Sequence, residues 1–210
     1  MSIITKKILV SFIMFLLFGF GISLQIKSNI GQSMLNALAL TLTDVLHIKI
    51  GTILNIVNLI FWSLNIIVRK LKVDKSDFIQ IIVTLLNCLI VNFFVYTLLQ
   101  SMVLDGYFLR LAIFISGLFL SSVTLGMLLA IGMIKFPLES LCITLSDLLH
   151  MKLSTVRYSV DVVFLGTILS LVMFTDVPLY IREGTVISFI LLSYLLGQSY
   201  KYFKNLCFMQ

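Results

Sequence analysis

The sequence predicts an all-α, polytopic membrane protein with six transmembrane helices, arranged as two inverted three-span repeats. Each repeat also holds a short helix that either lies at the membrane interface or re-enters the bilayer. Three observations carry this prediction: the composition, the lengths of the apolar runs and a sequence repeat at constant spacing. Of the 210 residues, 60% are hydrophobic and only 11% are charged, whereas soluble domains carry roughly 25% charged residues. This composition excludes a soluble globule and a disordered chain.

Six apolar runs are long enough to cross a bilayer, because a helix needs about 20 residues to span the hydrocarbon core. The first run follows Lys6 and Lys7 as a signal peptide would, but it is longer than a signal-peptide core and no small-residue cleavage site follows it. We therefore expect all six runs to form one membrane domain over residues 1–210. The predicted spans are residues 6–26, 50–69, 78–100, 108–131, 154–174 and 184–203.

Two shorter stretches, residues 33–47 and 136–150, are too short to cross and predict the two short helices. They are copies of one another. Placing residues 38–52 over 141–155, an offset of 103 residues, gives eight identities in fifteen positions. The chain therefore divides into internal repeats of approximately 6–100 and 108–204. Three crossings per repeat is an odd number, so the second copy must run through the membrane in the opposite sense, an arrangement associated with transporters.

Charge placement predicts the orientation in the membrane. With the N-terminus in the cytoplasm, most of the 15 Lys and Arg residues fall on the cytoplasmic side, as the positive-inside rule requires. We therefore expect both termini in the cytoplasm and interpret the net charge of +6 as an orientation signal rather than a nucleic-acid patch. The cytoplasmic set is Lys6, Lys7, Arg69, Lys70, Lys72, Lys75, Lys135, Lys152, Lys201 and Lys204, with Arg157 close by, and the outer set is Lys27, Lys49, Arg110 and Arg182.

Arg157 and Asp161 are the leading candidates for solute or ion binding. Spaced i,i+4 near the start of the fifth span, they share a helical face and can pair, and an ionisable residue inside a span marks a functional site by default. The repeat equivalent of Asp161 is Asn58, and Asn55 lies one turn before it on the same face. The second and fifth spans therefore carry polar stripes at similar depth. The alternative interpretation is that these groups only bond one another as contacts between helices.

Asn36 and Glu139 are also repeat-equivalent, and each opens one of the short helices. In a structural interpretation they are helix caps or favourable groups in the first turn. If the short helices re-enter the bilayer, these ends approach the midplane, where helix termini bind ions or substrate groups. We therefore include both residues among the candidate lining of a solute site.

Two Asp–His pairs follow the same repeat, each spaced i,i+3 on one predicted helical face, a spacing that suits metal ligation or proton relay. Inverted topology places the pairs on opposite sides of the membrane. We therefore expect interfacial side chains and no metal site, with Lys49 and Lys152 complementing the helix C-termini. The pairs are Asp44 with His47 and Asp147 with His150.

The sequence gives no signal for enzymatic chemistry. Cys88, Cys142 and Cys207 are scattered and form neither a disulfide framework nor a metal-ligand spacing. Gly-rich phosphate loops and zinc-type histidine motifs are missing, and no nucleophile has an adjacent base. We therefore expect a protein that is not an enzyme and has no catalytic residues and no cofactor.

Short motifs over nearly the whole chain resemble those of the YczE/YyaS/YitT family of bacterial integral membrane proteins. In the first half they are Gly19-Phe20-Gly21-Ile22-Ser23-Leu24, Gly31-Gln32-Ser33-Met34-Leu35-Asn36-Ala37-Leu38 and Ile50-Gly51-Thr52. In the second half they are Gly126, Pro137-Leu138-Glu139-Ser140-Leu141, Arg157 with Asp161, and Gly184-Thr185-Val186. Met34 stands where the family usually has Pro, and Leu138 where it has Arg. The resemblance implies a multi-pass protein of the bacterial plasma membrane, but it implies no substrate.

These observations favour a small secondary transporter or permease-like protein for an unidentified small solute or ion. The repeat and the ionisable residues inside a span carry this hypothesis. The alternative is a non-transporting membrane partner or regulatory scaffold for another protein, in which the polar stripes only pack helices. Its partners are then the lipid bilayer and either another protein or a second copy of the chain.

Overall fold

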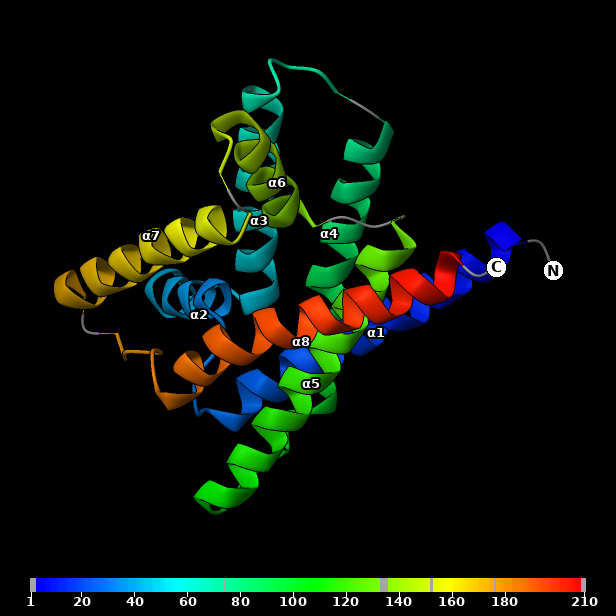
Figure 1. The fold of residues 1–210 in the computed structure, drawn as a ribbon. Coiled ribbons are helices and arrows are strands. Elements are labelled where there is room, and N and C mark those ends of the chain that lie inside the picture. The colour runs from blue at the N-terminus through cyan, green and yellow to red at the C-terminus, as the bar shows by residue number, and fades with distance from the viewer. Residues whose placement is uncertain (1–2, 74, 133–135, 152, 176, 209–210) are drawn as a thin grey trace. The chain divides into compact units, whose positions relative to one another are not determined.

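A computed structural model describes residues 3–73, 75–132, 136–151, 153–175 and 177–208. Helices are the only regular elements in these ranges (Figure 1). In chain order they are α1 (Ile3–Ser28), α2 (Met34–Leu46), α3 (Ile50–Val68), α4 (Lys75–Phe93), the π-helix η1 (Phe94–Leu98), α5 (Tyr107–Ile131), α6 (Pro137–Leu149), α7 (Leu153–Phe174) and α8 (Glu183–Phe208).

Five of the helices in the described part of the chain are long and apolar enough to cross a membrane. The crossing segments are Lys7–Ser28, Ile50–Val68, Asp77–Leu98, Tyr107–Ile131 and Thr155–Phe174. Helix α8 has 26 residues and is long enough, but polar side chains such as Gln198 and Lys201 make it less apolar than these five. The protein is therefore an all-helical membrane protein, and a sixth span at α8 stays a prediction.

The spacing of 103 residues recurs in the bounds of the helices. Helix α6 begins 103 residues after α2, at Pro137 against Met34, and ends 103 residues after it, at Leu149 against Leu46. The starts of α3 and α7 and the ends of α1 and α5 differ by the same number. His47 and His150, the residues after the two short helices, both have a left-handed backbone, with φ of 56° and 51°. The two copies thus share local structure as well as sequence.

Contacts group the chain into two compact units that each draw on both halves of the sequence. Unit 1 consists of Met1–Ser33, Ile90–Ile134 and Ile181–Gln210, and unit 2 of Met34–Leu89 and Lys135–Tyr180. Unit 1 therefore contains α1, η1, α5 and α8. Unit 2 contains α2, α3, most of α4, α6 and α7.

In unit 1, α5 packs against both α1 and α8 (Figure 1). Small residues allow the close approach. A Cβ atom on Gly117 would lie 2.7 Å from the carbonyl oxygen of Gly21, and a Cβ atom on Gly126 would lie 2.6 Å from the Cβ of Ser199. The buried Gln25 amide also donates to the Ser121 hydroxyl at 2.9 Å. Close backbone packing and a buried polar contact are the usual means of joining helices in lipid.

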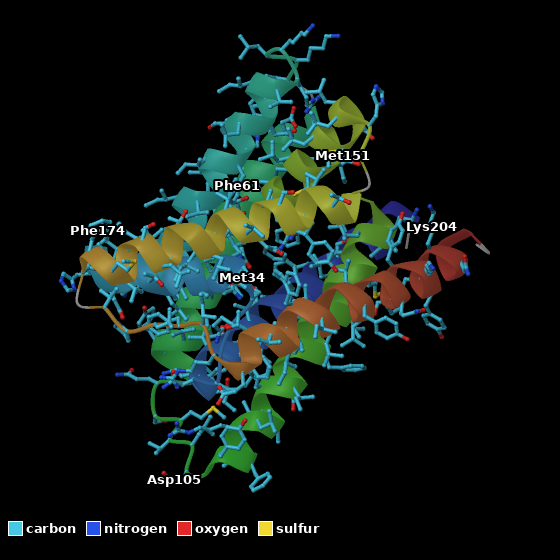
Figure 2. The ribbon with its side chains drawn as sticks, turned by 60° about the vertical axis from the view of Figure 1, so that its left-hand side comes forward. Met34, Phe61, Asp105, Met151, Phe174 and Lys204 are labelled. Carbon is cyan, nitrogen blue, oxygen red and sulfur yellow. The ribbon has the colours of Figure 1, made fainter. Side chains whose placement is uncertain are left out.

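In unit 2, α3 packs against α6 and α2 packs against α7. Helix α2 is the repeat equivalent of α6, and α3 is that of α7. Replacing each helix by its equivalent therefore turns the α3–α6 contact into the α2–α7 contact. Phe61 of α3, labelled in Figure 2, lies with its ring 5.7 Å from that of Phe164 of α7, measured between centroids. Phe61 and Phe164 are themselves 103 residues apart, so each is the repeat equivalent of the other. Equivalent residues of the two repeats are thus in direct contact within unit 2.

Large apolar side chains are exposed on many helices, as expected for surfaces that contact lipid rather than water. Phe108 and Phe174 are 85% and 87% exposed. Backbone groups inside the helices are satisfied internally, as a bilayer requires, and hydroxyls such as that of Thr41 donate to the carbonyl one turn earlier.

Candidate functional site

Three predicted site residues meet in unit 2, where α6 packs against α7. Arg157 of α7 donates from Nη1 to Oε1 of Glu139 on α6 at 3.2 Å. Its Nε lies 3.7 Å from Oδ2 of Asp161, one turn further along α7. We call Glu139, Arg157 and Asp161 the charged cluster. The predicted Arg157–Asp161 pair is therefore present, and Glu139 joins it from the other helix.

Local sequence explains how Glu139 reaches the cluster. Helix α6 begins with Pro137 at its first position, where the missing N–H has no intrahelical partner to lose. Glu139 then lies in the first turn, where the positive end of the helix dipole stabilises a carboxylate. Glu139 thus has the position of a favourable first-turn group, while no side-chain hydrogen bond caps α6, and its ion pair with Arg157 joins it to α7.

The C-terminal end of α6 is closed by a tight turn. His150 ends α6 in a left-handed conformation, with its N–H donating to the carbonyl of Ser146. The N–H of Met151 also donates to the carbonyl of Ser146 at 3.1 Å, and the Ser146 hydroxyl donates to the carbonyl of Met151 at 2.7 Å. These bonds close the C-terminal end of α6 up to Met151, and the contact between α6 and α7 brings Arg157 beside Glu139.

The charged cluster is largely shielded from solvent and carries an excess of negative charge. The side chains of Glu139 and Arg157 are each 26% exposed, and that of Asp161 is 12% exposed. With both carboxylates ionised the cluster has a formal charge of −1. Asp161 Oδ1 is buried and has no hydrogen-bond partner among the residues that the structure describes. The cluster therefore holds one carboxylate oxygen with unused capacity to accept a proton or to bind a cation.

Cys142 also lies on α6, and the charges of the cluster act on its thiol. Burial raises the pKa of its thiol to about 11, although the nearby Arg157 guanidinium acts to lower it. Cys142 is 2% exposed. Its thiol stays protonated at neutral pH, which makes it an inert core group. Within the described residues, no three His, Cys, Asp or Glu side chains converge as metal ligands.

The first repeat has uncharged residues at the positions equivalent to the charged cluster. The residues 103 positions before the cluster are Asn36, Leu54 and Asn58. Asn36 and Asn58 are both buried, and Asn58 donates its side-chain amide to the carbonyl of Leu54 in its own helix at 2.9 Å. Asn55 also lies on α3, with a buried Oδ1 atom that finds no hydrogen-bond partner in the described ranges. Of the six predicted binding residues, ion pairs join Glu139, Arg157 and Asp161.

The two predicted Asp–His pairs differ in the surroundings of their aspartates. Asp44 accepts a hydrogen bond from the Tyr180 hydroxyl at 2.5 Å, whereas its repeat equivalent Asp147 is exposed. The prediction of one shared helical face is wrong for both pairs, because α2 ends at Leu46 and α6 at Leu149. His47 and His150 follow in the left-handed region, where the helical spacing no longer applies.

The sequence also predicts that Lys49 and Lys152 complement the C-termini of the short helices. Lys49 is the residue before α3 and occupies its N-cap position, so it belongs to the start of the next helix. Lys152 and Lys135 lie outside the described residues.

Buried polar contacts that sequence reasoning missed join α6 to neighbouring helices. The Thr144 hydroxyl donates to Oδ1 of Asn65 on α3 at 2.7 Å, and the Gln80 amide of α4 donates to the Ser140 hydroxyl at 2.9 Å. The signal for them was present, since Asn65 and Gln80 are amides inside predicted spans. Their partners are ordinary helix residues that only the packing identifies.

The structure also shows an ion pair across the link between α3 and α4. Arg69 donates from Nη1 to both carboxylate oxygens of Asp77, at 2.9 and 3.1 Å, and the Trp62 indole donates to the Asp77 carbonyl at 3.0 Å. Arg69 appeared in the sequence only as an orientation charge. Its charge-assisted hydrogen bonds from Nη1 give it a structural role at the turn.

Comparison with protein families gives a match over most of the chain. The pattern of the Family of unknown function (DUF6198) matches residues 5–201, which contain every helix of the charged cluster. No curated protein and no solved structure matches the chain. The match carries no activity, and the finer resemblance to YczE/YyaS/YitT proteins stays a prediction. The chain belongs to the Family of unknown function (DUF6198).

Proposed function

We propose that this membrane protein is a small secondary transporter or permease, and that the charged cluster binds the transported solute or a coupling ion. The observation that carries the proposal is the buried, unpaired Oδ1 of Asp161 in a cluster of net negative charge. The proposal favours a proton or a small cation as the species bound, because the cluster has one more negative charge than positive.

Energetics supports a functional reason for the cluster. Shielding two carboxylates and a guanidinium from water costs several kcal/mol per ion, and the mutual attraction offsets this cost only when the geometry is good. The Arg157–Asp161 distance of 3.7 Å is longer than that of a good charge-assisted hydrogen bond. The first repeat folds with Asn36, Leu54 and Asn58 at the same positions, so the helix arrangement does not need the charges.

The repeat supports transport as the class of function. Transporters built from inverted repeats bind their substrate near the repeat interface and expose it alternately to the two sides. The exchange of α3–α6 for α2–α7 and the contact between Phe61 and Phe164 are the relations expected for a pseudo-twofold pair of repeats. The resemblance to the bacterial YczE/YyaS/YitT family favours the plasma membrane as the location, with both termini in the cytoplasm.

The proposal can be tested by flux measurements on the full chain in proteoliposomes. A panel of Na⁺, K⁺, organic amines and zwitterionic solutes is screened with and without a proton gradient, with a pH-sensitive dye inside the vesicles. We expect at least one solute to move faster than in empty vesicles. Asp161→Asn should reduce that flux about tenfold or more, because the amide cannot accept a proton or balance a cation.

Asp147→Asn is the matched control, since it removes the same charge from an exposed position on α6 and should leave the flux unchanged. The proposal fails if no solute in the panel moves, or if Asp161→Asn carries the solute at the wild-type rate. Absence of flux together with co-purification of a stoichiometric protein partner would favour the scaffold alternative.

A further inference from the structure

Unit 1 contains a pocket with two arginines that the charged cluster does not involve. Its volume is about 320 Å³, within the range of small-ligand sites. It lies where α1 ends and where α5 and α8 begin. We call it the arginine pocket. Its lining residues are Asn29, Ile30, Tyr107, Arg110, Arg182 and Glu183.

The wall of the pocket is held by backbone contacts between the end of α1 and the start of α8. The N–H of Gly184 donates to the carbonyl of Ile30 at 3.2 Å, and the Thr185 hydroxyl accepts from the N–H of Gln32 at 3.2 Å. Gly31 has a φ of 148°, and a Cβ atom there would lie 2.5 Å from the backbone nitrogen of Thr185. Only glycine permits this approach, so the wall is specified by the sequence.

Both arginines are anchored and still have donors to offer. Arg110 donates from Nε to the carbonyl of Leu104 at 3.0 Å, and Arg182 donates from Nη1 to the carbonyl of Asn29 at 2.8 Å. Each guanidinium has five N–H groups, and these bonds use one of them. Anchoring fixes the orientation of the planar groups, which lowers the entropy cost of binding a ligand between them.

The charge of the pocket selects an anion. Arg110 and Arg182 outweigh Glu183, which gives a formal charge of +1. The positive dipole ends of α5 and α8 add to this charge, and the negative end of α1 opposes it. Arginine pairs bind phosphate groups well, because the guanidinium fork matches two phosphate oxygens. Val103 and Phe108, next to the pocket in the sequence, are 78% and 85% exposed, as expected for residues that contact lipid.

We propose that the arginine pocket binds a phosphate group, supplied either by the headgroup of an anionic phospholipid or by a free phosphate in solution. The site would also explain why two of the four cations assigned to the outer side by sequence lie together. The inference uses no residue of the charged cluster and does not depend on transport.

The test measures binding to the full chain purified in a neutral detergent. Phosphatidylglycerol, phosphatidylcholine and inorganic phosphate are added separately, and binding is followed by native mass spectrometry and by thermal unfolding. We expect phosphatidylglycerol to bind more tightly than phosphatidylcholine if the source is a lipid, and inorganic phosphate to bind as well if the source is soluble. Arg110→Gln and Arg182→Gln should each weaken binding about tenfold, as the loss of one charged hydrogen bond predicts.

Lys72→Gln is the matched control, because it removes one exposed positive charge from unit 2 and should not change the affinity. If the arginine variants fail to fold, Glu183→Gln decides, since removing the negative charge should tighten binding severalfold. The proposal is overturned if neither phosphatidylglycerol nor inorganic phosphate binds, if the arginine variants bind like the wild type, or if Glu183→Gln leaves the affinity unchanged.

Discussion

Arg157 is the residue on which the charged cluster depends, because it is the cation that the structure places between the carboxylates of Glu139 and Asp161. Removing one partner of a shielded ion pair leaves an uncompensated charge, which is worse than removing the whole set. The first repeat shows what a neutral set looks like at the same positions: Asn36, Leu54 and Asn58. Residues of one repeat can therefore serve as a control for the other.

We predict that Arg157→Leu destabilises the protein by about 2–3 kcal/mol, because Glu139 and Asp161 then repel one another without a cation. The triple variant Glu139→Asn, Arg157→Leu, Asp161→Asn installs the residues of the first repeat and should recover most of this stability. Thermal unfolding in detergent measures both. A triple variant no more stable than Arg157→Leu would contradict the explanation.

A second prediction concerns Asp44. Tyr180→Phe removes the hydroxyl that donates to its carboxylate, and we expect a loss of about 1–2 kcal/mol, since hydrogen bonds to charged groups are the stronger ones. Asp147→Asn, at the exposed repeat equivalent, should change the stability by less than about 0.5 kcal/mol. Equal effects of the two substitutions in chemical unfolding would show that the Tyr180 contact contributes nothing.

Individual helices show which features arise only from packing. The predicted third span, residues 78–100, is α4 followed by the π-helix η1 (Phe94–Leu98). Within unit 1 the ring of Phe94 meets that of Phe20 edge-on, with centroids 5.1 Å apart. A π turn shifts the side chains after it around the helix axis, and apolar periodicity in an almost uniformly apolar run gives no signal for such a shift.

The crossing of α1 and α5 yields a prediction at the element scale. Gly117→Ala should cost about 1–3 kcal/mol, because the new methyl group meets the backbone oxygen of Gly21 and the helices must separate. Gly166→Ala is the control on α7, where a Cβ atom meets nothing within 4 Å and alanine raises helix propensity. If both variants unfold at the same temperature, close packing at Gly117 does not hold α1 against α5.

In the whole molecule, the two compact units do not coincide with the two sequence repeats. Each unit takes helices from both repeats, and neither unit corresponds to a single repeat. Intertwining of this kind follows when each copy of a helix packs on a different element of the other copy, as α2 does on α7 and α3 on α6. The helices that pack in unit 2 therefore come from both halves of the chain.

The number of spans sets the sides on which the termini lie. We predict that α8 crosses the membrane, which places both termini in the cytoplasm with most of the positive charge. Fusions of a reporter that fluoresces only in the cytoplasm should be bright at either end. A bright N-terminal fusion with a dark C-terminal one would establish five spans and remove the six-span topology.

Inversion of the repeats makes a separate prediction about equivalent positions. In a variant lacking the native cysteines, His47→Cys and His150→Cys should react with a membrane-impermeant maleimide from opposite sides. The positions are equivalent residues after α2 and α6, so a parallel repeat would expose them on the same side. Labelling of both from one side would contradict the inverted arrangement.

The sequence by itself determined the class of protein, the eight main helices to within a few residues, the repeat and the Arg157–Asp161 pair. It could do so because apolar length, identity at a constant offset and the i,i+4 spacing are local properties of a chain. The tertiary structure decided that Glu139 joins the pair, that Tyr180 binds Asp44 and that two arginines share a pocket. These are contacts between residues as much as 136 positions apart, and in a nearly uniform apolar chain only packing specifies which polar groups meet.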